Sequence, residues 1–238
     1  MSDKLATLLS AARDHARDVI APNVDAWNMA RVWPRTASDM AGAAGLTGLY
    51  APKDWGGQGL SLAQGIQIYE QLGQGDGAYA FALSMHNICT FAGCGYGTDA
   101  FKAKWARDLT SGRKLANFAL TEPQSGSDPM TMYTRASIND DGTWTISGAK
   151  AWVSLATEAD IYFTVVKTSD APGHKDMAMI AIPADAPGLS FGPRYDTPSY
   201  NFLPLAEMYM DKVVVSEDNI ILPIGQGLQG SLMAIDIA

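Results

Sequence analysis

The sequence has few cysteines, few charged residues and no long apolar run. Of its 238 residues, two are cysteines and 18% are charged. Cys89 and Cys94 lie in an apolar stretch, which excludes a disulfide framework and indicates buried thiols in a reducing compartment. No apolar run approaches the length of a membrane span, and residues 1–5 lack the apolar core of a signal peptide. We therefore expect a cytoplasmic protein without a membrane span.

The sequence also lacks a metal-binding pattern and a surplus of basic residues. His86 forms a short cluster with Cys89 and Cys94, but a zinc site needs more ligands than this segment supplies, so we expect no metal. The formal net charge of −8 argues against nucleic acid or an anionic membrane surface as the main partner. We expect His86 on a helix surface and His174 in a loop, neither of them catalytic.

Residues 1–114 have the 3.6-residue apolar period of amphipathic helices. Apolar residues make up 47% of the chain, enough for one large core or two modest ones. Ser61 and Gln64 form a capping-box pattern, and Thr98 is a second candidate N-cap. Helices are expected near residues 5–20, 34–44, 61–72, 78–90 and 98–109.

From residue 115 the pattern changes to the alternation of β-strands, with a hairpin turn at Asp141 and Gly142. After Pro223 a helical pattern returns with Leu228, Leu232 and Ile235. Strands are expected at residues 115–120, 131–139, 143–147, 150–153, 161–168, 177–183 and 207–215.

This order predicts an α+β fold. We expect an N-terminal all-helical domain at residues 1–114 and an antiparallel β-barrel or sandwich domain at residues 115–224. Residues 225–238 would form the first turns of a truncated C-terminal helical domain. Residues 225–230 also satisfy the pattern G-x-G-x-x-G, but no strand and acidic residue follow, as a dinucleotide fold requires. We interpret this pattern as the start of a helix.

The most informative stretch is residues 119–128, with the sequence ALTEPQSGSD. Two of its hydroxyl residues, Thr121 and Ser127, flank a turn that contains Pro123 and Gly126. Proline fixes one backbone dihedral, and glycine allows the chain to pass close to a ligand. Downstream, residues 152–154 offer an aromatic face and another hydroxyl.

Together these segments resemble the flavin-binding signature of the acyl-CoA dehydrogenases. Residues 49–61, 97–112, 144–152 and 211–219 resemble further segments of that family, in the family's order. The resemblance covers essentially the whole chain and accounts for two of the family's three domains. It implies FAD-dependent α,β-dehydrogenation of an acyl-CoA thioester. It also implies an electron-transfer flavoprotein or similar acceptor, and a homotetramer or homodimer for the full-length protein.

The resemblance also implies how individual residues would meet the cofactor. Ser127 would contact both the flavin and the CoA portion of the substrate, and Trp152 would pack against the isoalloxazine. Ser154 stands where many relatives have Thr, and Phe118 where many have Tyr. The implied cofactor-binding residues are Phe118, Leu120, Thr121, Gly126, Ser127, Trp152, Val153 and Ser154.

The catalytic base of the family is expected to lie outside these 238 residues. Relatives hold a glutamate in the C-terminal helical domain, and a minority place it at a position that aligns with Ala238 or its neighbour. Alanine is no base, and the counterpart of Glu122 belongs to the turn. The sequence leaves several alternatives open: a truncated dehydrogenase, a naturally short non-catalytic flavin-binding or partner subunit, and a ligand-free interaction module. Acyl-CoA oxidase, enoyl-CoA reductase and flavin monooxygenase chemistry on the same scaffold also stay open.

Overall fold

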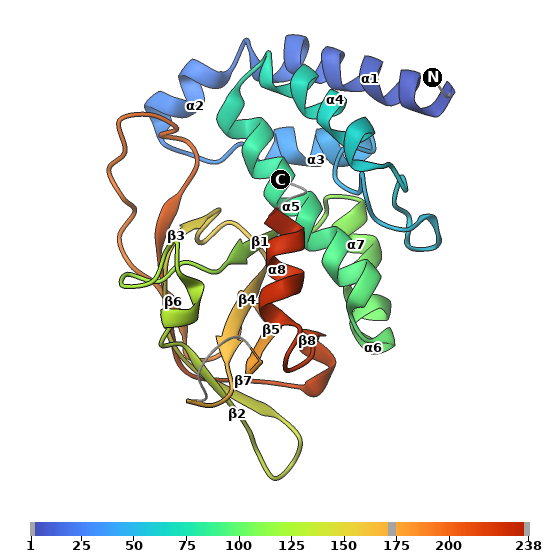
Figure 1. Cartoon of the computed structure of the whole chain (residues 1–238). Coiled ribbons are helices and arrows are strands. Elements are labelled where there is room, and N and C mark those ends of the chain that lie inside the picture. The colour runs from blue at the N-terminus through green and yellow to red at the C-terminus, as the bar shows by residue number, and fades with distance from the viewer. Residues whose placement is uncertain (1–2, 171–174, 236–238) are drawn as a thin grey trace.

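Helices come first and a mostly antiparallel sheet follows, which confirms the predicted α+β class (Figure 1). The computed structural model describes residues 3–170 and 175–235. In Figure 1 the helices of residues 3–73 lie at the top, those of residues 77–110 run down the right-hand side beside the sheet, and the last helix lies in front of the sheet.

The helical part agrees with the expected pattern except for the helix at residues 24–30, which was not predicted. Thr98 accepts a hydrogen bond from Phe101 N, and Ser61 N donates to Gln64 Oε1, so both predicted N-caps are confirmed. The main helices are α1 (Asp3–His15), α2 (Val24–Ala30), α3 (Arg35–Ala43), α4 (Leu62–Gly73), α5 (Gly77–Tyr96), α6 (Asp99–Phe101) and α7 (Arg107–Thr110). Shorter π-helical and 3₁₀ turns occupy Ala16–Ile20, Lys53–Trp55 and Lys102–Ala106.

Helix α5 is longer than predicted and continues through Gly93 to Tyr96. A Cβ at Gly93 would lie 2.7 Å from the Phe101 ring, so the glycine serves close packing and does not end the helix. The sequence pattern underestimated this helix because glycine usually marks a helix end.

The strands form one sheet with the order β6-β7-β3-β2-β4-β5-β8, and β1 pairs parallel with β4. The two strands expected at residues 143–153 are one long strand, β3. Two three-residue strands, β6 and β8, were not predicted, because so short a run carries no periodicity. The strands are β1 (Ala116–Ala119), β2 (Arg135–Ile138), β3 (Trp144–Ser154), β4 (Ile161–Lys167), β5 (Met177–Pro183), β6 (Leu189–Phe191), β7 (Leu205–Val215) and β8 (Ile220–Leu222).

His86 joins the helices to the sheet, and its expected position on a helix surface is wrong. Its side chain is fully buried. Ala116 N donates to Nδ1 at 3.0 Å, so Nε2 carries the proton and donates to Leu109 O at 3.0 Å. Burial lowers the pKa of His86 to about 4. The error arose because α5 is apolar on nearly all sides and packs against several elements. His174 lies outside the described residues.

The G-x-G-x-x-G segment opens the last helix, α8 (Gly227–Ile235), as expected. A Cβ at Gly227 would lie 2.6 Å from Ala178 N, so α8 begins in close contact with β5. Leu228 is buried, whereas Leu232 and Ile235 are exposed. Among residues 3–170 and 175–235, no helix combines the length and the apolar character needed to cross a bilayer.

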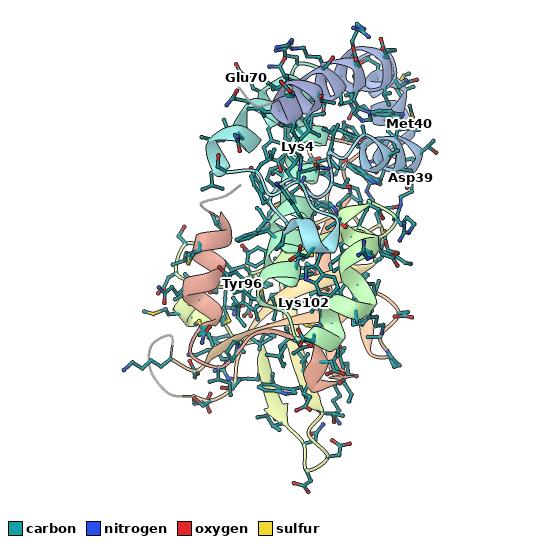
Figure 2. All side chains as sticks on the ribbon, turned by 90° about the vertical axis from the view of Figure 1, so that its right-hand side faces the viewer. Lys4, Asp39, Met40, Glu70, Tyr96 and Lys102 are labelled. Atoms are coloured by element: carbon teal, nitrogen blue, oxygen red, sulfur yellow. The ribbon has the colours of Figure 1, made fainter. Side chains whose placement is uncertain are left out.

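Figure 2 shows the side chains from a second direction. Lys4, Asp39, Met40 and Glu70 project from the helical part, whereas Tyr96 lies beside α8.

Both cysteines, Cys89 and Cys94, are buried free thiols, as predicted from their apolar surroundings. Burial raises the pKa of both thiols, which makes them poor nucleophiles.

Candidate functional site

The two segments singled out in the sequence lie side by side. Ala151 N, on β3, donates to Thr121 O at 2.8 Å, and Lys150 Nζ donates to Leu120 O at 3.2 Å. The turn after β1 is therefore attached to the last residues of β3, which brings Leu120 and Thr121 close to Trp152.

A β-bulge sets the orientation of Trp152. Lys150 pairs with Met208 and Val153 pairs with Ala206, so β3 takes three steps where β7 takes two. One extra residue in a strand bends the chain and turns a side chain away from its regular face. Trp152 has φ +57°, and the residue is 59% exposed. A bulky residue in this left-handed backbone region is uncommon, and such strain is concentrated at functional sites.

Val153 and Ser154 continue the strand on the other side of the bulge. Val153 is buried in the main hydrophobic cluster and pairs with Ala206, and Ser154 is buried and pairs with Leu205. The Val153 side chain therefore faces the core.

Phe118 and Leu120 precede the turn and anchor it to the hydrophobic core. Both are half-buried and pack against an apolar cluster that contains Phe101 and Phe163. Ala119, between them, is buried in the other cluster. This alternation is the period of a β-strand, so Phe118, on β1, and Leu120, directly after β1, lie on the same face.

The turn itself is closed by its own backbone. Glu122 N donates to Ser125 O at 2.8 Å, and Ser125 N donates to Glu122 O at 3.1 Å. Gly126 and Ser127 lie on the exposed side of this closure. A Cβ at Gly126 would meet no other atom within 4 Å, so the chain is open to a ligand there.

A buried ion pair lies behind the turn and was not predicted from the sequence. Lys150 Nζ lies 2.8 Å from Glu122 Oε1, and the two side chains are 0% and 1% exposed. Burial alone would raise the pKa of Glu122, but the Lys150 charge and the hydrogen bonds to the carboxylate lower it to about 2. Burial lowers the pKa of Lys150 to about 8, against the opposing effect of the Glu122 charge. A lysine directly before the apolar residues Ala151, Trp152 and Val153 was the available signal, since a buried lysine requires a partner.

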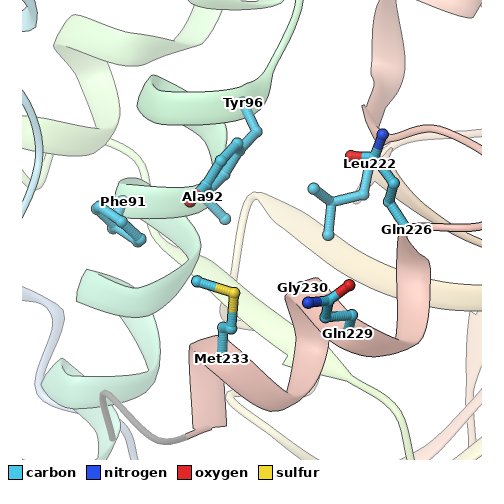
Figure 3. A pocket seen from close by; sticks show the side chains of 8 residues that line it. All are labelled: Phe91, Ala92, Tyr96, Leu222, Gln226, Gln229, Gly230 and Met233. Atoms are coloured by element: carbon cyan, nitrogen blue, oxygen red, sulfur yellow. The ribbon is translucent and has the colours of Figure 1, made fainter.

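An apolar cavity of about 140 Å³ lies elsewhere, between α5 and α8 (Figure 3). Phe91, Ala92 and Tyr96 of α5 face Gln229 and Met233 of α8 across it. None of the residues predicted for the flavin lines this cavity. Among the residues that the structure describes, no group of three or more His, Cys, Asp or Glu side chains has the arrangement of a metal site.

Comparison with known proteins connects this geometry to one family. The sequence profile of the acyl-CoA dehydrogenase N-terminal domain matches residues 2–113, and that of the acyl-CoA dehydrogenase middle domain matches residues 117–213. The chain therefore belongs to the acyl-CoA dehydrogenase family and contains its N-terminal and middle domains.

Individual relatives agree with this assignment. A mitochondrial isobutyryl-CoA dehydrogenase of Dictyostelium discoideum is 31% identical over 227 residues, which are 95% of this chain and 54% of that protein. The structure of butyryl-CoA dehydrogenase from Megasphaera elsdenii is 28% identical and superimposes with a TM-score of 0.93, over 100% of this chain and 63% of that one. A glutaryl-CoA dehydrogenase of Mycobacterium smegmatis in complex with FADH2 shares the fold at 23% identity, with a TM-score of 0.89 over 100% of this chain and 60% of that one. The chain thus spans 54–63% of the length of these relatives.

Proposed function

We propose that this chain forms the flavin-binding part of an FAD-dependent acyl-CoA dehydrogenase. The exposed Trp152 ring on a strained bulge, attached through Ala151 to Thr121, is the observation that carries this proposal. Two segments far apart in the sequence supply an aromatic face and hydroxyl groups at one place. A planar ring with a polar edge is the ligand that such a surface fits.

The residues of this site fit FAD in chemistry as well as in shape. Trp152 would pack on the isoalloxazine, and the hydroxyls of Thr121 and Ser154 would donate hydrogen bonds to its polar edge. Gly126 and Ser127, on the open side of the turn, would approach the rest of the cofactor. Phe118 and Leu120 would exclude water from the ring, and Val153 would continue the contact along β3. FAD, when bound, supplies the acceptor for the hydride that leaves the acyl β-carbon.

The substrate that we propose is an acyl-CoA thioester, with Ser127 contacting its CoA portion. In the overall reaction the α-carbon loses a proton, the β-carbon loses a hydride, and a carbon–carbon double bond forms between them. No residue of this chain is assigned to the proton. Reoxidation would require an electron-transfer flavoprotein or a similar acceptor.

The proposal is tested in the full-length protein in two stages. First, FAD is titrated into the purified protein, and its binding is followed by quenching of tryptophan fluorescence; saturable binding is expected. Second, butyryl-CoA and isobutyryl-CoA are added without oxygen, and loss of the oxidised-flavin absorbance is expected with at least one of them. Absence of saturable FAD binding would refute the proposal. FAD binding without bleaching by any acyl-CoA would instead support a non-catalytic flavin-binding subunit.

A further inference from the structure

Glu122 and Lys150 form a buried ion pair between the two segments of the proposed flavin site. Glu122 is the residue after Thr121, and Lys150 precedes Trp152 by two positions. Removing two charges from water is costly, and a buried pair persists only where further hydrogen bonds satisfy both groups. In this structure both the Glu122 carboxylate and the Lys150 ammonium make such further hydrogen bonds.

The Glu122 carboxylate connects three parts of the chain. It accepts hydrogen bonds from Tyr133 N at 2.5 Å, Thr134 N at 3.0 Å and Gln124 Nε2 at 2.6 Å, in addition to Lys150. The carboxylate therefore holds the segment that leaves the turn against the segment that enters it. A neutral amide in its place would accept fewer of these bonds, because one of its two ends donates.

The Lys150 ammonium makes the connection to β3. It donates to Glu122 Oε1 at 2.8 Å and to Leu120 O at 3.2 Å. The neighbouring residue, Ala151, donates its backbone N–H to Thr121 O. One side chain and one backbone group thus attach residues 120–122 to the strand that presents Trp152.

We infer that Glu122 and Lys150 are a positioning pair that sets the turn at residues 119–128 against Trp152 in the geometry that binds the flavin. This inference rests on the proposed function. A buried ion pair contributes little net stability compared with neutral side chains of similar size, whereas loss of one partner is strongly unfavourable. The pair therefore contributes orientation more than stability. Replacing both residues of the pair at once separates its effect on orientation from its effect on stability.

The experiment compares the double variant Glu122→Gln/Lys150→Met with each single variant in the full-length protein. Both single variants are expected to lower the thermal midpoint, because each leaves one buried charge without its partner. The double variant is expected to recover most of that loss yet still bind FAD about tenfold more weakly, the effect of one lost hydrogen bond. A double variant that binds FAD as tightly as the wild type would overturn the inference and leave the proposed function standing.

A second ion pair, at the start of β1, serves as a comparison. Lys114 Nζ lies 2.9 Å from Asp160 Oδ1, and Asp160 also pairs with Arg35 at 3.0 Å and accepts from Leu115 N. This cluster is more exposed than Glu122 and Lys150. The variant Lys114→Met/Asp160→Asn is expected to change the thermal midpoint without changing the FAD dissociation constant. An equal loss of FAD affinity in this control would show that any lost ion pair has the same effect, and would overturn the inference.

A measurement without cofactor completes the test. Hydrogen exchange in the FAD-free protein is expected to accelerate at the amides of Tyr133, Thr134 and Ala151 in Glu122→Gln. Unchanged exchange at these three amides would mean that the pair does not hold the turn, which overturns the inference. If the wild type fails to bind FAD, the proposed function falls, and with it the flavin-positioning role.

Discussion

The indole of Trp152 packs against the ring of Tyr195, with ring centroids 4.3 Å apart and an interplanar angle of 46°. Tyr195 lies between β6 and β7, and its backbone N–H donates to Leu205 O at 2.8 Å. It therefore covers part of the indole, although more than half of the Trp152 side chain stays exposed. The remaining surface is the part that the proposed function assigns to the flavin.

Replacement of Trp152 tests this assignment directly. We expect Trp152→Ala to raise the FAD dissociation constant about tenfold, because an aromatic contact contributes about 0.5–1.5 kcal/mol beyond its buried area. Trp152→Phe keeps a ring and should lose less. The measurement is a fluorescence titration with FAD.

The control for this titration is Tyr96→Ala. Tyr96 is also a half-exposed ring, but it lies on α5 beside the cavity shown in Figure 3. Its loss should leave FAD binding unchanged. Equal binding by Trp152→Ala and the wild type would remove Trp152 from the flavin site.

The backbone at Trp152 makes a separate prediction about stability. The left-handed backbone conformation costs a non-glycine residue about 1–2 kcal/mol of free energy, whereas glycine adopts it with almost no such cost. Trp152→Gly and Trp152→Ala both remove the indole, so they differ mainly in this cost. We expect the glycine variant to have the higher free energy of unfolding, by about 1 kcal/mol, in urea titrations. An alanine variant as stable as the glycine variant would contradict the strained geometry.

The sequence predicted the order of helices and strands well, because long periodic segments report which face is buried. The hairpin at Gly142 and the caps at Ser61 and Thr98 were confirmed for the same reason: local chemistry determines them. The merging of two expected strands into β3 was missed, because Gly148 appears as a break in the pattern. In the structure a Cβ at Gly148 would lie 2.6 Å from Thr134 Oγ1, so this glycine permits close approach within a continuous strand.

The segments that form the candidate site could be predicted from the sequence, but the contacts that hold these segments together could not. Thr121 and Trp152 stand in motifs that resemble a known family, so their proximity could be anticipated. The ion pair between Glu122 and Lys150 and the contact of Tyr195 with Trp152 depend on long-range register across the sheet. A bulge of one residue changes that register, and no local pattern in the sequence specifies it.

His86 predicts how acid destabilises the fold. Its pKa in the folded protein is lowered to about 4 by burial, from an ordinary value of 6.5. Between these two values the unfolded chain binds the proton and the folded chain does not, so stability falls as the pH falls from about 6.5 to 4. We expect a loss of up to about 3 kcal/mol from this group, measured by urea unfolding at a series of pH values.

His86→Gln should flatten this dependence, because glutamine does not titrate. His15 has a similarly lowered pKa, about 4, and its Nε2 lies 3.0 Å from the Tyr79 hydroxyl. His15→Gln therefore serves as the comparison. Each variant should remove only the part of the pH dependence of unfolding that comes from the histidine it replaces. An unchanged pH dependence in His86→Gln would show that the imidazole is not buried in its neutral form.

Two glycines on the same helix predict opposite responses to one substitution. Alanine is normally worth about 0.5–1 kcal/mol more than glycine inside a helix. Gly73, at the end of α4, has space for a Cβ, since no other atom lies within 4 Å. At Gly65 the same Cβ would overlap the buried ring of Tyr50. We therefore expect Gly73→Ala to raise the thermal midpoint and Gly65→Ala to lower it.

The second effect should disappear when the obstructing atoms are removed. Tyr50→Leu shortens the side chain that faces Gly65, so the combination Gly65→Ala/Tyr50→Leu should be more stable than the sum of the two single changes predicts. Such coupling is expected only for residues in contact. Thermal unfolding of the four proteins measures it. Strictly additive effects would mean that Tyr50 does not pack on Gly65. The destabilisation by Gly65→Ala would then need another explanation.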